Sequence, residues 1–329
     1  LRNGTFATAP SQRHLRNGTF NHGRIIMRLF EDADYSLIPN RRIGYAISGT
    51  LLTLSIISLL WKGLALGIDF RGGMEFVVGN TTDIATAEVR SSLVGPLADE
   101  PEVKRFGETG HLIRVSSSDD ITTVENRVLG ALQSAFPGQD VRIEKTNVVG
   151  PRFAEDLKRG AIYAVLGALL VIFLYIMVRF EWRYSLGAVA ALVHDVTITL
   201  GLFSILAGIV PFSLQIDQSI IAAFLTIVGY SLNDTVVVFD RVREYVNLFK
   251  TEPFDEIVNR SINATLSRTV VTSVTTFIVV SILFLFGGEV LRGFSFALIV
   301  GVIIGTYSSI FVASPTVVEL NRRLETSTA

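Results

Sequence analysis

The segment Gln218-Ser-Ile-Ile-Ala-Ala-Phe-Leu-Thr-Ile-Val-Gly-Tyr-Ser-Leu-Asn-Asp-Thr-Val-Val-Val-Phe-Asp240 decides the fold of this chain, because it is long and apolar enough to span a bilayer. Asp234 lies well inside it. A carboxylate within an apolar helix costs about 2.5–3.5 kcal/mol on insertion scales, so such residues usually face a bundle interior and have a function there. The role of Asp234 is therefore the main question that the sequence raises.

Other polar side chains accompany Asp234 along this segment. Tyr230 lies four residues before it and Arg241 seven residues after it. Ser231 lies three residues before it, and Asn233 is adjacent. Helical spacing predicts that these side chains share one face, and a polar face must contact other helices because lipid cannot satisfy it. Asp234 either carries protons or joins helices as a structural polar seam. The carrier interpretation is favoured, because Ser or Asn would join helices at a lower cost.

Five further apolar runs are long enough to cross a membrane. We therefore expect an α-helical membrane protein with six transmembrane helices, which is half of a pseudo-symmetric transporter. The expected spans are about 43–61, 160–178, 184–210, 218–239, 270–286 and 293–312. The expected organisation is a cytoplasmic tail at 1–42, transmembrane helix 1 at 43–62, an extracytoplasmic domain at 63–158, transmembrane helices 2–6 at 159–313 and a cytoplasmic tail at 314–329.

Lysine and arginine residues indicate on which side of the membrane each short loop lies. They gather in the N-terminal tail, the hairpin 179–183, the loop 241–268 and the C-terminal tail, whereas the opposite loops carry only Arg292. The positive-inside rule therefore places both termini in the cytoplasm. The hexapeptide Leu1–Phe6 recurs at Leu15–Phe20; a duplicated leader and a functional repeat are both open interpretations.

The composition excludes several classes of function. The chain has no cysteine, so disulfides, thiolate metal sites and cysteine nucleophiles are absent. Its net charge of −1 provides no basic surplus for nucleic acid. Its four histidines, at positions 14, 22, 111 and 194, have no metal-ligand spacing, and neither a hydrolase triad nor a phosphate-binding loop is recognisable. We expect a transport component that is not an enzyme and that has no nucleic-acid partner, metal or organic cofactor.

The long polar stretch after the first span alternates strand and helix signals. Strands are expected at 74–78, 102–106, 111–115 and 141–147, and helices at 82–94 and 118–136. The order β-α-β-β-α-β predicts a ferredoxin-like α+β domain between transmembrane helices 1 and 2. Two short tethers join it to the membrane, at 63–73 and at Gly150-Pro151. We expect this domain to bind or to move relative to the helices.

The fifth expected span places an arginine at its cytoplasmic end. Arg268 is followed by Thr269 and Thr272, which continue a hydroxyl-bearing face. Arg268 either anchors the helix at the membrane surface or turns inward as the charge partner of Asp234. The hydroxyl face favours the second interpretation, because it indicates that this side of the helix contacts protein or water.

The third expected span contains a second intramembrane acid. Asp195 follows His194 near the middle of the membrane. A relay function and a structural pairing are equally compatible with Asp195. We interpret His194 as a hydrogen-bonded packing residue rather than as a proton acceptor.

Three ordered motifs give the chain a family resemblance. They are Gly67-Ile-Asp-Phe-Arg-Gly-Gly73, Gly229-Tyr-Ser-Leu-Asn-Asp-Thr-Val-Val-Val-Phe-Asp-Arg-Val-Arg-Glu244 and Leu266-Ser-Arg-Thr-Val-Val-Thr-Ser273. On these motifs, residues 30–323 resemble the SecF family, the smaller half of the SecDF protein-export complex in the resistance-nodulation-division superfamily. By this resemblance, Asp234 and Arg268 fall on the family's proposed proton-path positions. Asp195 falls on a position whose role is less defined.

The resemblance implies an accessory to the Sec translocase that uses the proton-motive force to promote preprotein export on the outer side of the membrane. Na⁺ is an alternative coupling ion. The implied partners are SecD, the SecYEG translocon with SecA, the preprotein and membrane lipid, with YajC and YidC as further candidates. The implied location is the bacterial inner membrane. Two other functions stay open: a small-molecule proton antiporter of the same superfamily, and a non-transporting translocon scaffold.

Overall fold

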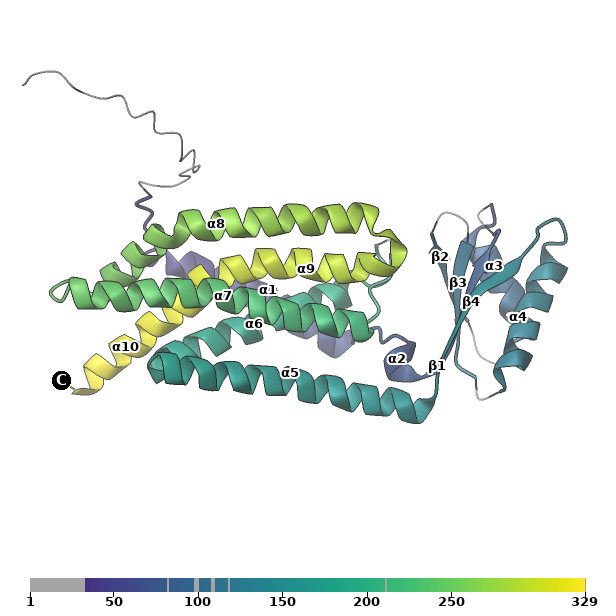
Figure 1. Cartoon of the computed structure of the whole chain (residues 1–329), viewed down its shortest axis with the longest axis horizontal. Coiled ribbons are helices and arrows are strands. Elements are labelled where there is room, and N and C mark those ends of the chain that lie inside the picture. The colour runs from purple at the N-terminus through teal and green to yellow at the C-terminus, as the bar shows by residue number, and fades with distance from the viewer. Residues whose placement is uncertain are drawn as a thin grey trace, which may run out of the picture.

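A helical bundle and a small α+β domain make up the chain (Figure 1). The computed structural model describes residues 33–81, 83–97, 101–107, 110–117, 119–210 and 212–328, so the repeated hexapeptide lies outside the described residues. Within the described part, six helices are long and apolar enough to cross a membrane. The expected fold class, six membrane helices with an antiparallel sheet domain, is confirmed.

The first five membrane helices are α1 (Arg41–Trp61), α5 (Pro151–Arg179), α6 (Trp182–Leu206), α7 (Gln218–Leu248) and α8 (Phe254–Phe286). Helix α5 begins at Pro151 rather than near residue 160, α7 continues past residue 239, and α8 begins before residue 270. These helices are longer than the apolar runs because backbone hydrogen bonding continues into polar sequence once a helix has formed. Hydropathy marks only the part of a helix that lipid can cover.

The sixth span is divided into α9 (Gly288–Ser308), one π-helical turn η1 (Ser309–Ala313) and α10 (Ser314–Thr328). Pro315 lies just after the π turn and has no N–H to donate into the preceding turn. The hydroxyl of Ser314 donates to the carbonyl of Ser309 at 2.8 Å and satisfies one acceptor there. Helix α10 leaves the line of α9 at this point (Figure 1).

The α+β domain is a four-stranded sheet covered by two helices. It contains β1 (Gly73–Gly79), α3 (Thr86–Leu93), β2 (Glu102–Phe106), β3 (Gly110–Val115), α4 (Ile121–Ala135) and β4 (Arg142–Val149). The strand order is β2-β3-β1-β4, with all neighbouring strands antiparallel. This is the ferredoxin-like arrangement that the sequence predicts. Its core is closed by side chains from both layers, including Phe76, Val89, Ile113 and Val128, which are fully buried.

The first tether of this domain is held against the bundle. A short helix, α2 (Ile68–Arg71), lies within it, and its Phe70 is buried against side chains of α6, α7 and α9. The backbone N–H of Gly67 donates to the carbonyl of Ile216 at 2.8 Å, and the carboxylate of Asp69 accepts from the N–H of Gln218 at 2.9 Å. The glycines of the tether therefore do not leave it free, because it is hydrogen-bonded to the start of α7.

Candidate functional site

Helix α7 lies against α9 at a distance that only glycine permits. A Cβ atom added at Gly305 would come within 2.9 Å of Cβ of Ser231, and one added at Gly301 would come within 2.2 Å of the side chain of Ile227. Small residues four apart allow two membrane helices to approach in this way. The approach positions Ser231 of α7 and Ser308 of α9 around a common acceptor on α6.

That acceptor is Asp195, which is 1% exposed. Its Oδ2 accepts hydrogen bonds from the hydroxyls of Ser231 at 2.6 Å and Ser308 at 2.7 Å, and its Oδ1 lies 2.9 Å from Nδ1 of His194. Three helices therefore supply polar groups to one buried carboxyl group. Buried carboxyl groups are tolerated when their oxygens are satisfied in this way.

The hydrogen bonds continue from His194 to α1. Nε2 of His194 lies 3.1 Å from Oγ of Ser48, which lies 3.0 Å from the hydroxyl of Tyr307. The Tyr307 hydroxyl donates to the carbonyl of Gly44 at 2.8 Å. We call His194, Asp195, Ser48, Tyr307, Ser231 and Ser308 the Asp195 network.

Asp234 lies one helical turn after Ser231 and faces α8 instead. It is 3% exposed, and its Oδ2 is buried without a hydrogen-bond partner in the described part of the chain. Ser273 of α8 is close to its carboxyl group. Ser273 also accepts a hydrogen bond from the hydroxyl of Tyr230 at 3.3 Å and lies 2.6 Å from Oγ1 of Thr306 on α9. We call these four residues the Asp234 cluster.

Arg268 is exposed on α8. Its charge acts on Asp234, but within the described residues no ion pair at 4.0 Å or less joins the two. The guanidinium group therefore stands near the carboxyl group without closing on it.

The expected polar stripe is only partly realised. Asn233 is exposed on the outer surface of α7, because one residue is about 100° of helix rotation and turns it away from Asp234. Thr269 is buried as expected, whereas the hydroxyl of Thr272 donates within its own helix to the carbonyls of Arg268 and Thr269, both at 3.0 Å. Tyr230 and Ser231 do face other helices, but they serve different clusters.

Sequence reasoning missed three members of the Asp195 network: Ser48, Tyr307 and Ser308. A single serine in an apolar helix is common, so none of them is conspicuous alone. The available signal was the spacing of Gly44, Ser48 and Ser55 in α1, which gives one face of small residues at intervals of four and seven. All three are buried.

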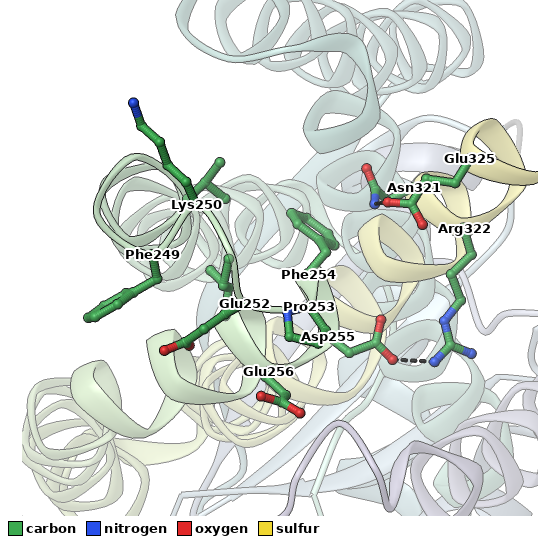
Figure 2. Close-up of a pocket in the computed structure, with 12 residues that line it drawn as sticks. Phe249, Lys250, Glu252, Pro253, Phe254, Asp255, Glu256, Asn321, Arg322 and Glu325 are labelled. Carbon is green, nitrogen blue, oxygen red and sulfur yellow. Dashed lines mark hydrogen bonds and ion pairs between the residues drawn. The ribbon is translucent and has the colours of Figure 1, made fainter. Parts of the chain in front are cut away.

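A hollow of about 660 Å³ lies at the end of the bundle far from the sheet domain. Figure 2 shows it between the turn from α7 to α8 and helix α10, with Asp255 facing Arg322. Arg41 of α1 also approaches Asp255, at 3.8 Å, and pairs with Glu319 at 2.9 Å. These ion pairs join the ends of α1, α8 and α10. The hollow has no arrangement of nucleophile and base, so we interpret it as a structural junction.

A second cleft, of about 650 Å³, separates the sheet domain from the loop that precedes α7. Gln215 of this loop donates a hydrogen bond to Glu102 of β2. Burial acts to raise the pKa of Glu102, but hydrogen bonds from Lys104 and Gln215 and the charges of Lys104 and Arg114 together place that pKa below its usual value. Glu102 therefore accepts across the cleft as a carboxylate at neutral pH.

Comparisons with known proteins agree with this arrangement of membrane helices. The family model described as "Protein export membrane protein SecD/SecF, C-terminal" matches residues 130–323. That match defines the class: a membrane component of protein export.

Individual related proteins identify the family within this class. The protein translocase subunit SecF of Rhodothermus marinus is 63% identical over 297 residues, which cover 90% of this chain and 96% of that protein. The protein translocase subunit SecF of Haemophilus influenzae is 40% identical over 286 residues, which cover 87% and 86%. The chain belongs to the SecF family of protein translocase subunits. It is accordingly an accessory component of protein translocation.

Two solved structures share the fold. The crystal structure of SecDF, a translocon-associated membrane protein from Thermus thermophilus, matches with a TM-score of 0.79 at 35% identity over 88% of this chain. SecDF in its super-membrane-facing form matches with a TM-score of 0.67 at 35% identity over 91% of this chain. This chain spans 39% and 40% of those two chains, so it corresponds to part of each.

Proposed function

We propose that this chain, paired with a SecD half, uses the proton-motive force to promote preprotein export on the outer side of the membrane. The observation that carries the proposal is the buried Oδ2 of Asp234, which has no hydrogen-bond partner among the described residues. An ionised carboxylate with an unsatisfied buried oxygen is costly. A proton relieves that cost, and so does the approach of Arg268.

These two ways of satisfying Asp234 belong to different arrangements of α7 and α8. Arg268 already acts on Asp234 without pairing with it, so a small shift of one helix along the other closes or widens the gap. Closing the gap pairs the charges and leaves no need for the proton, whereas widening it favours proton uptake. Proton transfer would thereby be coupled to relative movement of the two helices.

Movement of α7 would reach the outer domain directly. The first turn of α7 is bound by Asp69 through the N–H of Gln218 and by Asp217 through the N–H of Ile220, both at 2.9 Å. Asp69 belongs to α2, which only Gly72 separates from β1. We infer that the outer domain follows α7 and acts on the preprotein.

The surface of α7 supports a partner half. Ala222, Thr226, Gly229 and Asn233 are exposed at intervals of four and three residues. Such small and polar residues pack membrane helices together more readily than they face lipid. We propose that SecD packs on this face of α7 and that the assembly acts beside SecYEG and SecA. YajC and YidC are further candidates, and the proposed location is the bacterial inner membrane with both termini cytoplasmic.

The test is the preprotein export rate, measured against an imposed proton-motive force, for wild type and Asp234→Asn. Asn is nearly isosteric and cannot take up and release a proton, so we expect normal membrane insertion and loss of the force-dependent part of export. Asp240→Asn is the matched control, because Asp240 lies on the same helix, is exposed and pairs with Arg179. It should export at the wild-type rate.

Wild-type, force-dependent export by Asp234→Asn would overturn the proposal and favour a scaffold role. Replacing the proton gradient by a sodium gradient identifies the ion. Export that follows the sodium gradient alone would assign the same site to Na⁺.

A further inference from the structure

A series of hydrogen bonds runs from Gly44 to Asp195. Its two ends restrict which atom is the donor in each bond. Ser48, His194 and Asp195 are 7%, 4% and 1% exposed, so their polar atoms have little access to solvent. The carbonyl oxygen of Gly44 can only accept. At the other end, Oδ2 of Asp195 already accepts from Ser231 and Ser308.

Protons can be counted along this series of hydrogen bonds, first with the Tyr307 hydroxyl donating to Gly44. The single hydroxyl proton of Tyr307 is used at Gly44. Ser48 must then donate to Tyr307 and accept from Nε2–H of His194. With Nε2 protonated, the 2.9 Å contact between Nδ1 of His194 and Oδ1 of Asp195 needs a proton of its own. The pair then holds one proton more than a carboxylate beside a neutral imidazole.

All but one of these contacts also accommodate the pair without that extra proton. The imidazole then carries its proton on Nδ1 and donates to Oδ1, while bare Nε2 accepts from Ser48. Ser48 in turn accepts from Tyr307. The 2.8 Å contact between the Tyr307 hydroxyl and the Gly44 carbonyl then lacks a proton and must lengthen, while that carbonyl keeps its hydrogen bond from the helical N–H four residues later. The two states differ by one proton and by the orientation of two hydroxyl groups.

We propose that His194 and Asp195 form a second proton-holding site, separate from Asp234, and that Ser48 and Tyr307 are positioning residues whose hydroxyl groups reverse direction as the site is loaded. Loading takes one proton from water, breaks no other bond and leaves Nε2 of His194 protonated. Unloading returns that proton and leaves Nε2 bare. The use of this site in export rests on the proposed function, whereas its protonation does not.

Few other titratable groups face this pair. On α7 the acid nearest to Ser231 is Asp234, which lies one turn beyond it and faces α8, and on α9 the titratable group at the pair is Tyr307 itself. The π turn Ser309–Ala313 carries no titratable side chain. The charged residues of the other three helices lie toward the helix ends. They are Arg41 and Arg42 on α1, Arg152, Glu155, Asp156, Lys158, Arg159 and Arg179 on α5, and Glu319, Arg322, Arg323 and Glu325 on α10. The remaining titratable groups of these helices are Tyr45, Tyr163 and Tyr175.

The test uses the full chain in lipid nanodiscs with ¹⁵N-labelled histidine. The chain has four histidines, so the ring signals are few, and His194→Gln identifies those of His194. The ¹⁵N shift separates a protonated ring nitrogen from a bare one. We expect Nε2 of His194 to change from bare to protonated as the pH is lowered between about 9 and 5. One unchanging protonation state over this range would overturn the proposal, and this wild-type measurement does not depend on any variant folding.

The positioning role is tested by Ser48→Ala and Tyr307→Phe against Ser58→Ala. Ser58 is the matched control, because it also joins α1 to α6 through a hydroxyl, at 2.8 Å from Ser204, but outside the network. Losing Ser48 removes a hydrogen bond from both states of Nε2, and the bond donated by the protonated, charged ring is the stronger of the two, so the His194 transition should move to lower pH. Tyr307→Phe should move it less, and Ser58→Ala should leave it in place. Equal transitions in all variants would remove Ser48 and Tyr307 from the proposal.

Asp234→Asn distinguishes this site from the proposed function. The His194 transition should persist in that variant even where export is lost. Its disappearance would show that Asp234 and the pair titrate as one site and would contradict the separation proposed here. Unimpaired export in Asp234→Asn would overturn the proposed function and leave the His194 measurement unaffected.

Discussion

At the scale of single residues, Arg268 and Asp234 are close without being paired. We predict that Arg268→Ala inserts normally but reduces force-dependent export by at least about tenfold, the factor that corresponds to 1.4 kcal/mol. Arg268→Lys should restore export only in part, because an ammonium group lacks the planar fork of donors. Export rates of the two variants check this. Full rates in both would leave Arg268 as a membrane anchor.

His111 of the sheet domain predicts that the stability of this domain depends on pH. Its ring lies 2.8 Å from Oγ1 of Thr81 and 3.2 Å from Oγ1 of Thr86. Burial lowers the pKa of His111, and the charge of Arg105 on the facing strand lowers it further. The unfolded chain therefore takes up a proton near pH 6.5 that the folded domain takes up only at lower pH. The domain should be fully stable above about pH 6.5 and lose stability as the pH falls below it.

The measurement of this pH effect is thiol labelling of Val128→Cys, a fully buried core position in a chain without other cysteines. Labelling against denaturant at about pH 7.5 and 5.5 gives the opening free energy of the domain at each pH. In the same background His111→Gln should reduce the difference. An equal difference with and without His111 would assign the effect to other groups.

At the scale of elements, the contact between α7 and α9 depends on a missing side chain. Gly305→Ala would place Cβ 2.9 Å from Cβ of Ser231, so one of the two helices must shift. We predict destabilisation by about 1–3 kcal/mol, the usual cost of overpacking. Thermal unfolding in detergent checks this, with Gly167→Ala of α5 as the control. An added Cβ at Gly167 meets no atom within 4 Å, so a similar loss there would exclude close packing as the cause.

Element types and their order could be predicted from the sequence, and contacts between elements only partly. Apolar length is sufficient to find the membrane helices, and alternation is sufficient for the strands around Phe76 and Ile113. Asp234 and Asp195 are conspicuous because charge in an apolar helix is rare. Which helix each acid faces depends on rotation and crossing of the helices. Ser231 therefore looked like a companion of Asp234, whereas it binds Asp195.

Arg268 shows a second limit of the sequence, which concerns distances between side chains. The hydroxyl face of α8 leads to the prediction that Arg268 turns toward Asp234, but no pattern in one sequence sets the distance between two charges. The tether around Asp69 is a second case. Its glycines suggested freedom, and the long-range hydrogen bond to Gln218 that restrains it has no local sequence signal.

At the scale of the whole molecule, the sheet domain touches the bundle through Glu102 and Gln215. We predict that a reductant-cleavable cross-link between cysteines at these two positions stops export and that reductant restores it. The reason is that a domain driven by α7 through the single joint at Asp69 must change its contact with Gln215 as it turns, and a second, covalent joint prevents that turn. Each single-cysteine variant, treated identically, is the control. Unimpaired export with the cross-link intact would rule out the moving-domain mechanism.

The π-helical turn Ser309–Ala313 determines how α10 is rotated about its own axis. A π turn holds about one residue more than an α-helical turn, and one residue rotates a helix by about 100°. Three contacts of α10 depend on this rotation: Glu319 with Arg41, Asn321 with Arg183, and Arg322 with Asp255. Shortening this turn by one residue would leave every side chain of α10 chemically unchanged yet direct all three away from their partners. The ion pairs and hydrogen bonds of the last helix should thus depend on the length of this turn, whichever side chains it carries.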